Sequence, residues 1–138
     1  MRLKQKFFQK SLFVYRKEMK TSSIFSHPGS WGPPAWTFLH CVSMTYPEKP
    51  DTIEQKKYKQ FFSSLGNVLP CKKCRVEYKI WLKKYPIENH LSSRKALVRW
   101  LVRLHNDVNR RNNKPVRKIK DAILDVETRC SHYLSQKL

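Results

Sequence analysis

Apolar residues recur at three- and four-residue steps along most of this chain, and prolines separate the runs. This spacing places apolar side chains on one face of an α-helix, and we find no convincing strand alternation. Prolines suit the entrance of a helix and the loops between helices. Only 3 glycines occur among 138 residues, which disfavours a β-sandwich full of tight turns. The pattern predicts an all-α fold in which short loops join the helices of a bundle.

Five helical segments are expected from local start signals and apolar stripes. The starts lie at Pro33 and Pro34, at a capping box of Asp51 and Glu54, at Pro70 and Cys71, at Ser92 or Ser93, and at Pro115. In chain order, the expected inward faces are Trp36, Leu39, His40 and Ser43 or Met44; Ile53, Phe61, Phe62, Leu65, Val68 and Leu69; Val76, Ile80 and Trp81; Leu97, Trp100, Leu101, Leu104 and Val108; and Ile119, Ile123, Val126, Cys130 and Tyr133 or Leu134.

The first 28 residues differ from the rest in composition. Residues 1–20 hold seven basic residues and one acidic residue, and serines follow. Phe8, Leu12 and Tyr15 would share one helix face, as in a transit peptide or a basic arm on a membrane or nucleic acid. We expect residues 1–28 to be a basic extension, a flexible arm or targeting segment, with a break at His27-Pro28-Gly29. Residues 29–138 form the expected domain, and no apolar run is long enough to span a membrane.

The formal net charge of +19 is large for a chain of this length. Such a surface attracts anions, which include nucleic acid, acidic lipid, acidic proteins and phosphate-bearing cofactors. A solvated basic surface with a basic tail explains the same number. The net charge therefore bears on which molecules the protein associates with, and it does not predict the fold.

The sequence "LPCKKC" places Cys71 and Cys74 three residues apart at an expected helix start. The helix dipole and the neighbouring Lys72, Lys73 and Arg75 lower the pKa of a thiol there, which favours a reactive thiolate. Incidental thiols, a zinc site and a redox pair are the three interpretations. Zinc needs four ligands, and a C-x-H second half from Cys130 and His132 is unusual, so the redox pair is favoured.

A second polar motif, "HNDVNRRNNKP", follows from His105 to Pro115. His105, Asn106 and Asn109 lie on one side of the expected fourth helix, and Lys114 beside Pro115 suits a phosphate contact. Exposed polar residues are common on helices, so solvent-facing positions explain each residue taken singly.

Four stretches taken together resemble the Erv/ALR sulfhydryl oxidase family: "WGPPAWTFLH", "YPEKP", "LPCKKC" and "HNDVNRRNNKP". They occur in the family's order and spacing over about residues 31–115. The tryptophan directly before Gly32 is more similar to members from large DNA viruses than to mitochondrial ones.

The resemblance implies a bundle of four main helices plus a short fifth, usually as a homodimer, with FAD bound within the bundle. It implies that substrate protein thiols, or a thioredoxin-like dithiol carrier, pass electrons through Cys71 and Cys74 to FAD and then to oxygen, giving hydrogen peroxide. Cys71 would exchange with substrate and Cys74 would lie next to the flavin; no metal is implied. The family positions that contact FAD correspond to Gly32, Trp36, His40, Tyr46, Trp100, His105, Asn106, Asn109 and Lys114.

The chain departs from many relatives in its other cysteines. Val102 replaces a cysteine of the fourth helix, and its usual partner is missing from residues 116–120, so the clamp near the adenine is absent. No second C-x-x-C occurs in the first 30 residues. Cys130 is then the one candidate shuttle or intersubunit link, although we expect Cys41 and Cys130 to be buried thiols.

The alternative function is a basic helical nucleic-acid-binding module in which zinc binds the C-x-x-C. A non-enzymatic dimerising scaffold is a third hypothesis. The compartment stays open between the host cytoplasm or a virion assembly site, if the protein is viral, and the mitochondrial intermembrane space.

Overall fold

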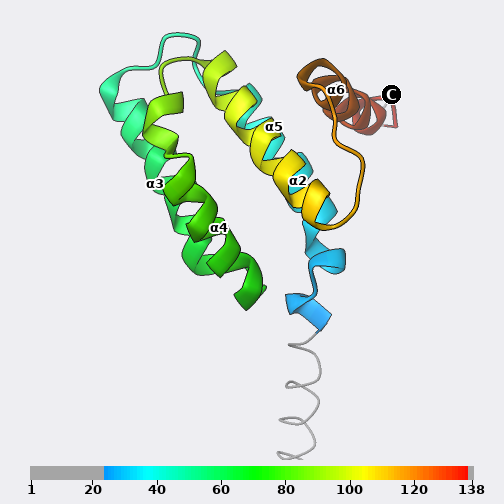
Figure 1. Ribbon diagram of the computed structural model, residues 1–138. Coiled ribbons are helices and arrows are strands. Elements are labelled where there is room, and N and C mark those ends of the chain that lie inside the picture. Colours follow the sequence, from blue (N-terminus) through cyan, green and yellow to red (C-terminus); the bar gives the residue numbers. More distant parts are fainter. Residues whose placement is uncertain (1–23, 137–138) are drawn as a thin grey trace, which may run out of the picture.

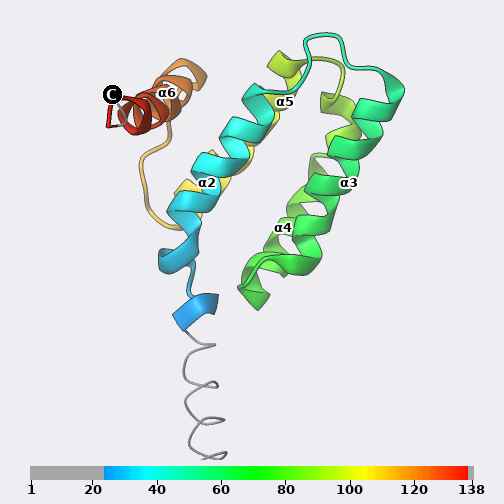
Figure 2. The same ribbon diagram turned by 180° about the vertical axis from the view of Figure 1, so that it is seen from behind.

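A computed structural model describes residues 24–136 of the chain. Its elements are α2 (Pro28–Met44), α3 (Thr52–Val68), α4 (Lys72–Lys84), the 3₁₀ helix η1 (Ile87–His90), α5 (Arg94–Arg111) and α6 (Ile119–Ser135). Helix α2 packs along α5 and α3 packs along α4, while α6 lies to one side (Figures 1 and 2). No strand occurs in this part of the chain, so the predicted all-α bundle of four main helices and a fifth is confirmed.

Side-chain caps start three of the helices as the sequence predicts. Asp51 accepts from the backbone N–H of Glu54 at 2.7 Å, and the Glu54 carboxylate accepts from the N–H of Asp51 at 3.3 Å. Ser93 caps α5 by accepting from Ala96, and the Cys71 sulfur caps α4. Each cap supplies an acceptor for an N–H group that has no partner within the helix.

The expected entrance of the first helix is wrong by about a turn. Helix α2 begins at Pro28, so Pro33 and Pro34 lie inside it, and the helical structure is interrupted at His27, directly before it. The His27 ring accepts from the N–H of Gly29 at 3.1 Å and thereby caps the helix earlier in the chain. Trp31 Nε1 also donates to the carbonyl of Ser26 at 3.3 Å. The remainder of the basic extension, residues 1–23, lies outside the described residues, and its proposed role stays a prediction.

An aromatic core joins α3, α4 and α5. Phe62, Trp81 and Trp100 are at most 5% exposed and meet in edge-to-face pairs with ring centroids about 5 Å apart. Tyr78 donates its hydroxyl to the Phe62 carbonyl at 2.7 Å. Gly66 allows the close approach of α3 and α4, because an added Cβ would lie 3.0 Å from Lys79 Cγ and 3.5 Å from Tyr78.

The expected inward faces hold for α2 and α5 but only in part for the other helices. On α5, Leu97, Trp100, Leu101 and Leu104 are buried as predicted. The predictions for several apolar residues are wrong, since these are exposed on α3, α4 and α6: Ile53, Val68, Val76, Ile80, Ile119, Tyr133 and Leu134. Helix α4 buries Trp81 as predicted, and it buries Tyr78 and half-buries Cys74 in place of Val76 and Ile80. Cys74, Tyr78 and Trp81 lie on one face at three- and four-residue steps.

Helix α6 is attached to the bundle by a small contact. Ala122 packs with Val98 and Val102 of α5 in a cluster that is separate from the aromatic core. The loop 112–118 that leads to α6 is exposed throughout, and Asn113 takes a left-handed conformation with φ 54° at the end of α5. Between residues 24 and 136 we find no helix with the length and apolar character needed to cross a membrane.

Candidate active site

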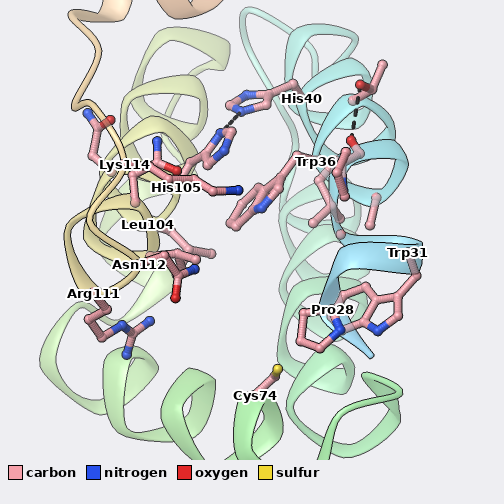
Figure 3. Close-up of a pocket in the computed structure, with 18 of the residues that line it drawn as sticks. Pro28, Trp31, Trp36, His40, Cys74, Leu104, His105, Arg111, Asn112 and Lys114 are labelled. Atoms are coloured by element: carbon pink, nitrogen blue, oxygen red, sulfur yellow. Dashed lines mark hydrogen bonds between the residues drawn. The ribbon is translucent and has the colours of Figure 1, made fainter. Parts of the chain in front are cut away.

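A cavity of about 690 Å³ lies between α2, α4, α5 and the loop before α6. Figure 3 shows Cys74 directing its sulfur into the cavity at one end, with Trp36, His40 and His105 gathered at the other. Apolar side chains from three helices form the walls, among them Leu39, Leu65, Leu69, Leu104 and Val108. The size and the apolar walls are those of a site for a large organic ligand.

The cysteine pair forms one end of this cavity as a disulfide between Cys71 and Cys74. Cys71 is the N-cap of α4, and its sulfur accepts from the N–H of Cys74 at 3.1 Å. Both cysteines are half-buried. The pair lies at the positive end of the α4 helix dipole, which stabilises a thiolate.

Trp36, His40 and His105 form an aromatic cluster at the opposite end. The Trp36 and His105 rings stack at 4.0 Å with planes 7° apart, and His40 Nε2 lies 3.0 Å from His105 Nδ1. Burial lowers the pKa of both histidines to about 4, with smaller contributions from Arg129 on both and from His40 on His105. Both rings are therefore neutral near pH 7 and present a flat, polarisable surface.

Basic side chains line the flank of the cavity where the loop and α6 approach α5. These are Arg111, Lys114, Arg117 and Arg129, with Lys73 near the disulfide end. Arg117 is also paired with Asp125 at 2.6 Å, and Arg111 lies 3.7 Å from Glu77. The excess of cations over carboxylates favours an anionic group such as a diphosphate.

Most of the sequence-predicted site residues meet in this one cavity. Its lining includes Gly32, Trp36, His40, Cys71, Cys74, His105, Asn106, Asn109 and Lys114. Tyr46 and Trp100 do not line it. Tyr46 is fully buried and donates to the carbonyl of Leu91 at 2.8 Å, while Trp100 donates to the carbonyl of Tyr85 at 3.0 Å. Core packing accounts for both positions.

Sequence reasoning missed the lining residues Trp31, Glu77, Arg111, Arg117 and Arg129. Glu77 follows Cys74 by three residues, so helical spacing from the cysteine pair was a signal for it. Arg117 comes from the exposed loop and Arg129 from α6. The periodicity of the sequence does not show where α6 packs against α2.

The residues of the cavity fit FAD. His40 is 2% exposed, and its Nδ1 atom has no hydrogen-bond partner in the described structure, as expected of a group that awaits a ligand. A Cβ added at Gly32 would meet no atom within 4 Å, so this glycine leaves open space in the wall. Aromatic walls suit the ring systems, the basic flank suits the diphosphate, and the disulfide end suits a redox-active ring.

The described residues do not bring together the ligands that the zinc alternative requires. Cys71 and Cys74 are bonded to each other, and Cys130 lies against Cys41 instead. Within residues 24–136 no group of three or more potential ligand residues is placed to hold a metal ion.

The fold and the cavity together define a helical thiol–disulfide oxidoreductase with an internal site for a flat, anionic cofactor. Comparison with known proteins agrees. A probable FAD-linked sulfhydryl oxidase, R368, of Acanthamoeba polyphaga mimivirus is 42% identical over 101 residues, which cover 72% of this chain and 71% of that protein. The crystal structure of the yeast Erv1 core has a TM-score of 0.66 at 27% identity and covers 70% of this chain and 80% of that chain.

The chain belongs to the Erv1 / Alr family, which matches residues 33–130. The resemblance drawn from the four sequence motifs is thus confirmed. The mitochondrial FAD-linked sulfhydryl oxidase erv1 of Schizosaccharomyces pombe is 34% identical over 85 residues, and the match spans 47% of its length. These relatives are named as oxidases, and no comparison supports the nucleic-acid-binding alternative.

Proposed function

We propose that this chain is a flavin-dependent thiol oxidase, which makes disulfides in substrate proteins and delivers the electrons to oxygen. The observation that carries the proposal is the Cys71–Cys74 disulfide at one end of a cavity with aromatic walls and a basic flank. Family membership supports the same activity, since the matched relatives are named FAD-linked sulfhydryl oxidases.

The first chemical step is thiol–disulfide exchange at Cys71. A substrate thiolate attacks Cys71 Sγ, the bond to Cys74 breaks, and Cys74 leaves as a thiolate. The assignment of these two roles follows the family resemblance, and Figure 3 shows the Cys74 sulfur directed into the cavity.

The second step releases the oxidised substrate. Its other thiolate attacks the substrate sulfur of the mixed disulfide, and Cys71 leaves as a thiolate. The N–H of Cys74, 3.1 Å from Cys71 Sγ, and the N-terminal dipole of α4 stabilise this leaving group. The substrate has then lost two electrons and two protons and holds a disulfide, and Cys71 and Cys74 are reduced.

The cofactor site lies along the residues that line the rest of the cavity. When bound there, FAD supplies a two-electron acceptor that restores the Cys71–Cys74 disulfide and passes the electrons to oxygen as hydrogen peroxide. Trp36, His40 and His105 would hold a ring system, while Lys114 and Arg117 would neutralise the diphosphate. Leu65, Leu69 and Leu104 contribute apolar walls to the same cavity.

The proposed partners are protein dithiols or a thioredoxin-like dithiol carrier, together with a second copy of the chain. Phe38 on α2 is 57% exposed and meets Phe61 of α3 edge-to-face at 6.2 Å. Ile53 and Val68 of α3 are also more than 60% exposed. Figure 2 shows α2 and α3 on the same side of the molecule. Exposed apolar residues on these two helices suit a homodimer interface.

Single serine substitutions at the cysteine pair test the activity. We expect Cys71→Ser and Cys74→Ser each to reduce oxidation of dithiothreitol and of reduced thioredoxin to background, because neither variant can form the disulfide. Both should still purify with FAD. Oxygen uptake and hydrogen peroxide are measured per bound flavin. The control is Cys130→Ser, a cysteine substitution outside the cavity, and we expect this variant to keep the wild-type turnover. Full turnover in either cavity variant, or wild-type protein that takes up no FAD, contradicts the proposal.

A further inference from the structure

Two cysteines outside the cavity lie against each other across the fold. Cys41 on α2 and Cys130 on α6 have their Sγ atoms 3.6 Å apart, although 89 residues separate them in sequence. Both are half-buried, and neither is bonded in the structure. The two sulfurs join helices that are far apart in sequence, and the proposed oxidase cycle uses neither of them.

Helix α6 has few other contacts that would hold it in place. Only Ala122 and Val126 of its described residues are buried. Apart from the small apolar cluster with α5, Arg129 Nη1 reaches Thr37 Oγ1 of α2 at 3.4 Å, which is a long hydrogen bond. Figure 1 shows the helix set to one side of the bundle at the end of its loop.

We propose that Cys41 and Cys130 form a second, intrachain disulfide that cross-links α6 to α2. The inference goes beyond the proposed oxidase function and does not depend on it. It also differs from the initial expectation of two buried free thiols and from a role for Cys130 as a shuttle or intersubunit link.

The reaction is a balanced exchange with another disulfide. A thiolate of the pair attacks a low-molecular-weight or protein disulfide, forms a mixed disulfide and releases one thiol. The second cysteine of the pair displaces the other thiol, so the S–S bond forms while two electrons and two protons pass to the oxidant. The sulfurs need to approach by roughly 1.5 Å to reach a bond of about 2.05 Å. A helix with so few buried residues can shift by this distance.

The cross-link would be placed where it fixes the wall of the cavity. Its two cysteines are adjacent in sequence to His40 and Arg129, which both line the cavity. Burial and the neighbouring Cys130 raise the pKa of Cys41, which favours the protonated thiol of Cys41 in contact with the Cys130 sulfur 3.6 Å away. Closing the bond would hold α6, and with it Arg129, against α2.

Peptide mapping of the full chain tests the cross-link directly. Protein treated with oxidised glutathione is blocked with N-ethylmaleimide in denaturant and digested with trypsin, which releases Cys130 on residues 130–137. We expect a reducible mass that joins this peptide to the one with Cys41. A mixture of ¹⁵N-labelled and unlabelled protein should give only unmixed pairs. Three results would overturn the proposal: Cys41 and Cys130 each bonded only to glutathione, both recovered as alkylated free thiols, or cross-linked peptides of mixed isotope.

Thermal unfolding tests whether the bond holds α6. In a Cys71→Ser/Cys74→Ser background, which removes the other redox pair, we expect the oxidised protein to unfold roughly 5–10 °C above the reduced protein. The further change Cys130→Ala should abolish the difference, and Ser131→Ala, an exposed neighbour on α6, should leave it intact. Equal midpoints for the oxidised and reduced background protein count against a cross-link that stabilises the fold.

Discussion

At the scale of single residues, the histidine pair explains how a polar group is kept inside an aromatic wall. His40 and His105 share one hydrogen bond of 3.0 Å, and the indole of Trp36 covers one face of His105. Arg129 and, for His105, Lys114 and Arg117 add positive potential, which together with burial disfavours protonation. The two histidines stay neutral near pH 7. They can therefore form a surface that binds a ring system although cations lie beside them.

The neutral pair makes the stability of the cofactor-free protein depend on pH. The folded-state pKa of about 4 lies below the ordinary histidine value of 6.5, so between these limits the unfolded chain binds protons that the folded chain does not. Stability is complete above about pH 6.5 and declines as the pH falls towards 4. Because the two rings are coupled, we expect a total loss of about 3 kcal/mol rather than two independent losses.

Urea unfolding between pH 4 and 7 measures this loss. His105→Gln should flatten the profile over that range, since it removes one of the depressed groups. His132→Gln, at an exposed histidine of α6, retains the same carboxylates and should follow the wild-type profile. A His105→Gln profile as steep as that of the wild type would show that the pair is not the source.

At the scale of elements, the loop between α5 and α6 is fixed by one asparagine. Asn106 Nδ2 donates to the Arg117 carbonyl at 2.8 Å, and Asn106 Oδ1 accepts from the Arg117 N–H at 3.0 Å. The motif predicted Asn106 as a cofactor contact, and it does line the cavity. Its amide is nevertheless occupied by the loop, so the geometry makes it the residue that positions Arg117, while the N–H of Lys114 donates to the Asn109 carbonyl at 2.8 Å.

Removal of this amide should loosen the basic flank. We expect Asn106→Ala to lower the free energy of unfolding by about 1–2 kcal/mol, the contribution of two partly exposed hydrogen bonds. FAD affinity should fall roughly tenfold as the loop cations lose their position. Chemical denaturation and flavin titration measure both effects, with Asn89→Ala on η1 as an exposed control. If Asn106→Ala is destabilised but its FAD affinity is unchanged, the position of the loop does not affect cofactor binding, and the prediction is wrong.

Sequence patterns located the helices better than they oriented them. Caps and prolines act within one turn, so Asp51, Cys71 and Ser93 gave the starts of three helices. Helix α4 carries apolar residues on two faces, and the sequence alone did not show that Tyr78, rather than Ile80, would pack against α3. The cysteine–histidine constellation was predictable because it lies in contiguous motifs, whereas Arg129 depends on where α6 docks.

At the scale of the whole molecule, the proposed homodimer would cover the exposed apolar residues of α2 and α3 with a second copy of the chain. In a symmetric dimer the same residue contributes from both copies, so each substitution acts twice. Phe38 is the largest exposed side chain of that face on α2, and its contact with Phe61 orients it for packing. If truncation costs about 1 kcal/mol per copy, Phe38→Ser should raise the dimer dissociation constant by roughly 30-fold.

Light scattering over a dilution series measures this constant. The matched control is Ile80→Ser, where the parent side chain is 64% exposed and lies on α4, outside the two helices of the proposed face. Both variants lose an exposed apolar side chain, so solubility and surface hydrophobicity change alike, but only Phe38→Ser should shift the monomer–dimer equilibrium. A wild-type chain that stays monomeric at all concentrations, or equal constants for the two variants, would mean that the α2–α3 face does not pair with itself. Because the cysteine cavity lies within one chain, thiol oxidation per bound flavin should persist in the monomeric variant.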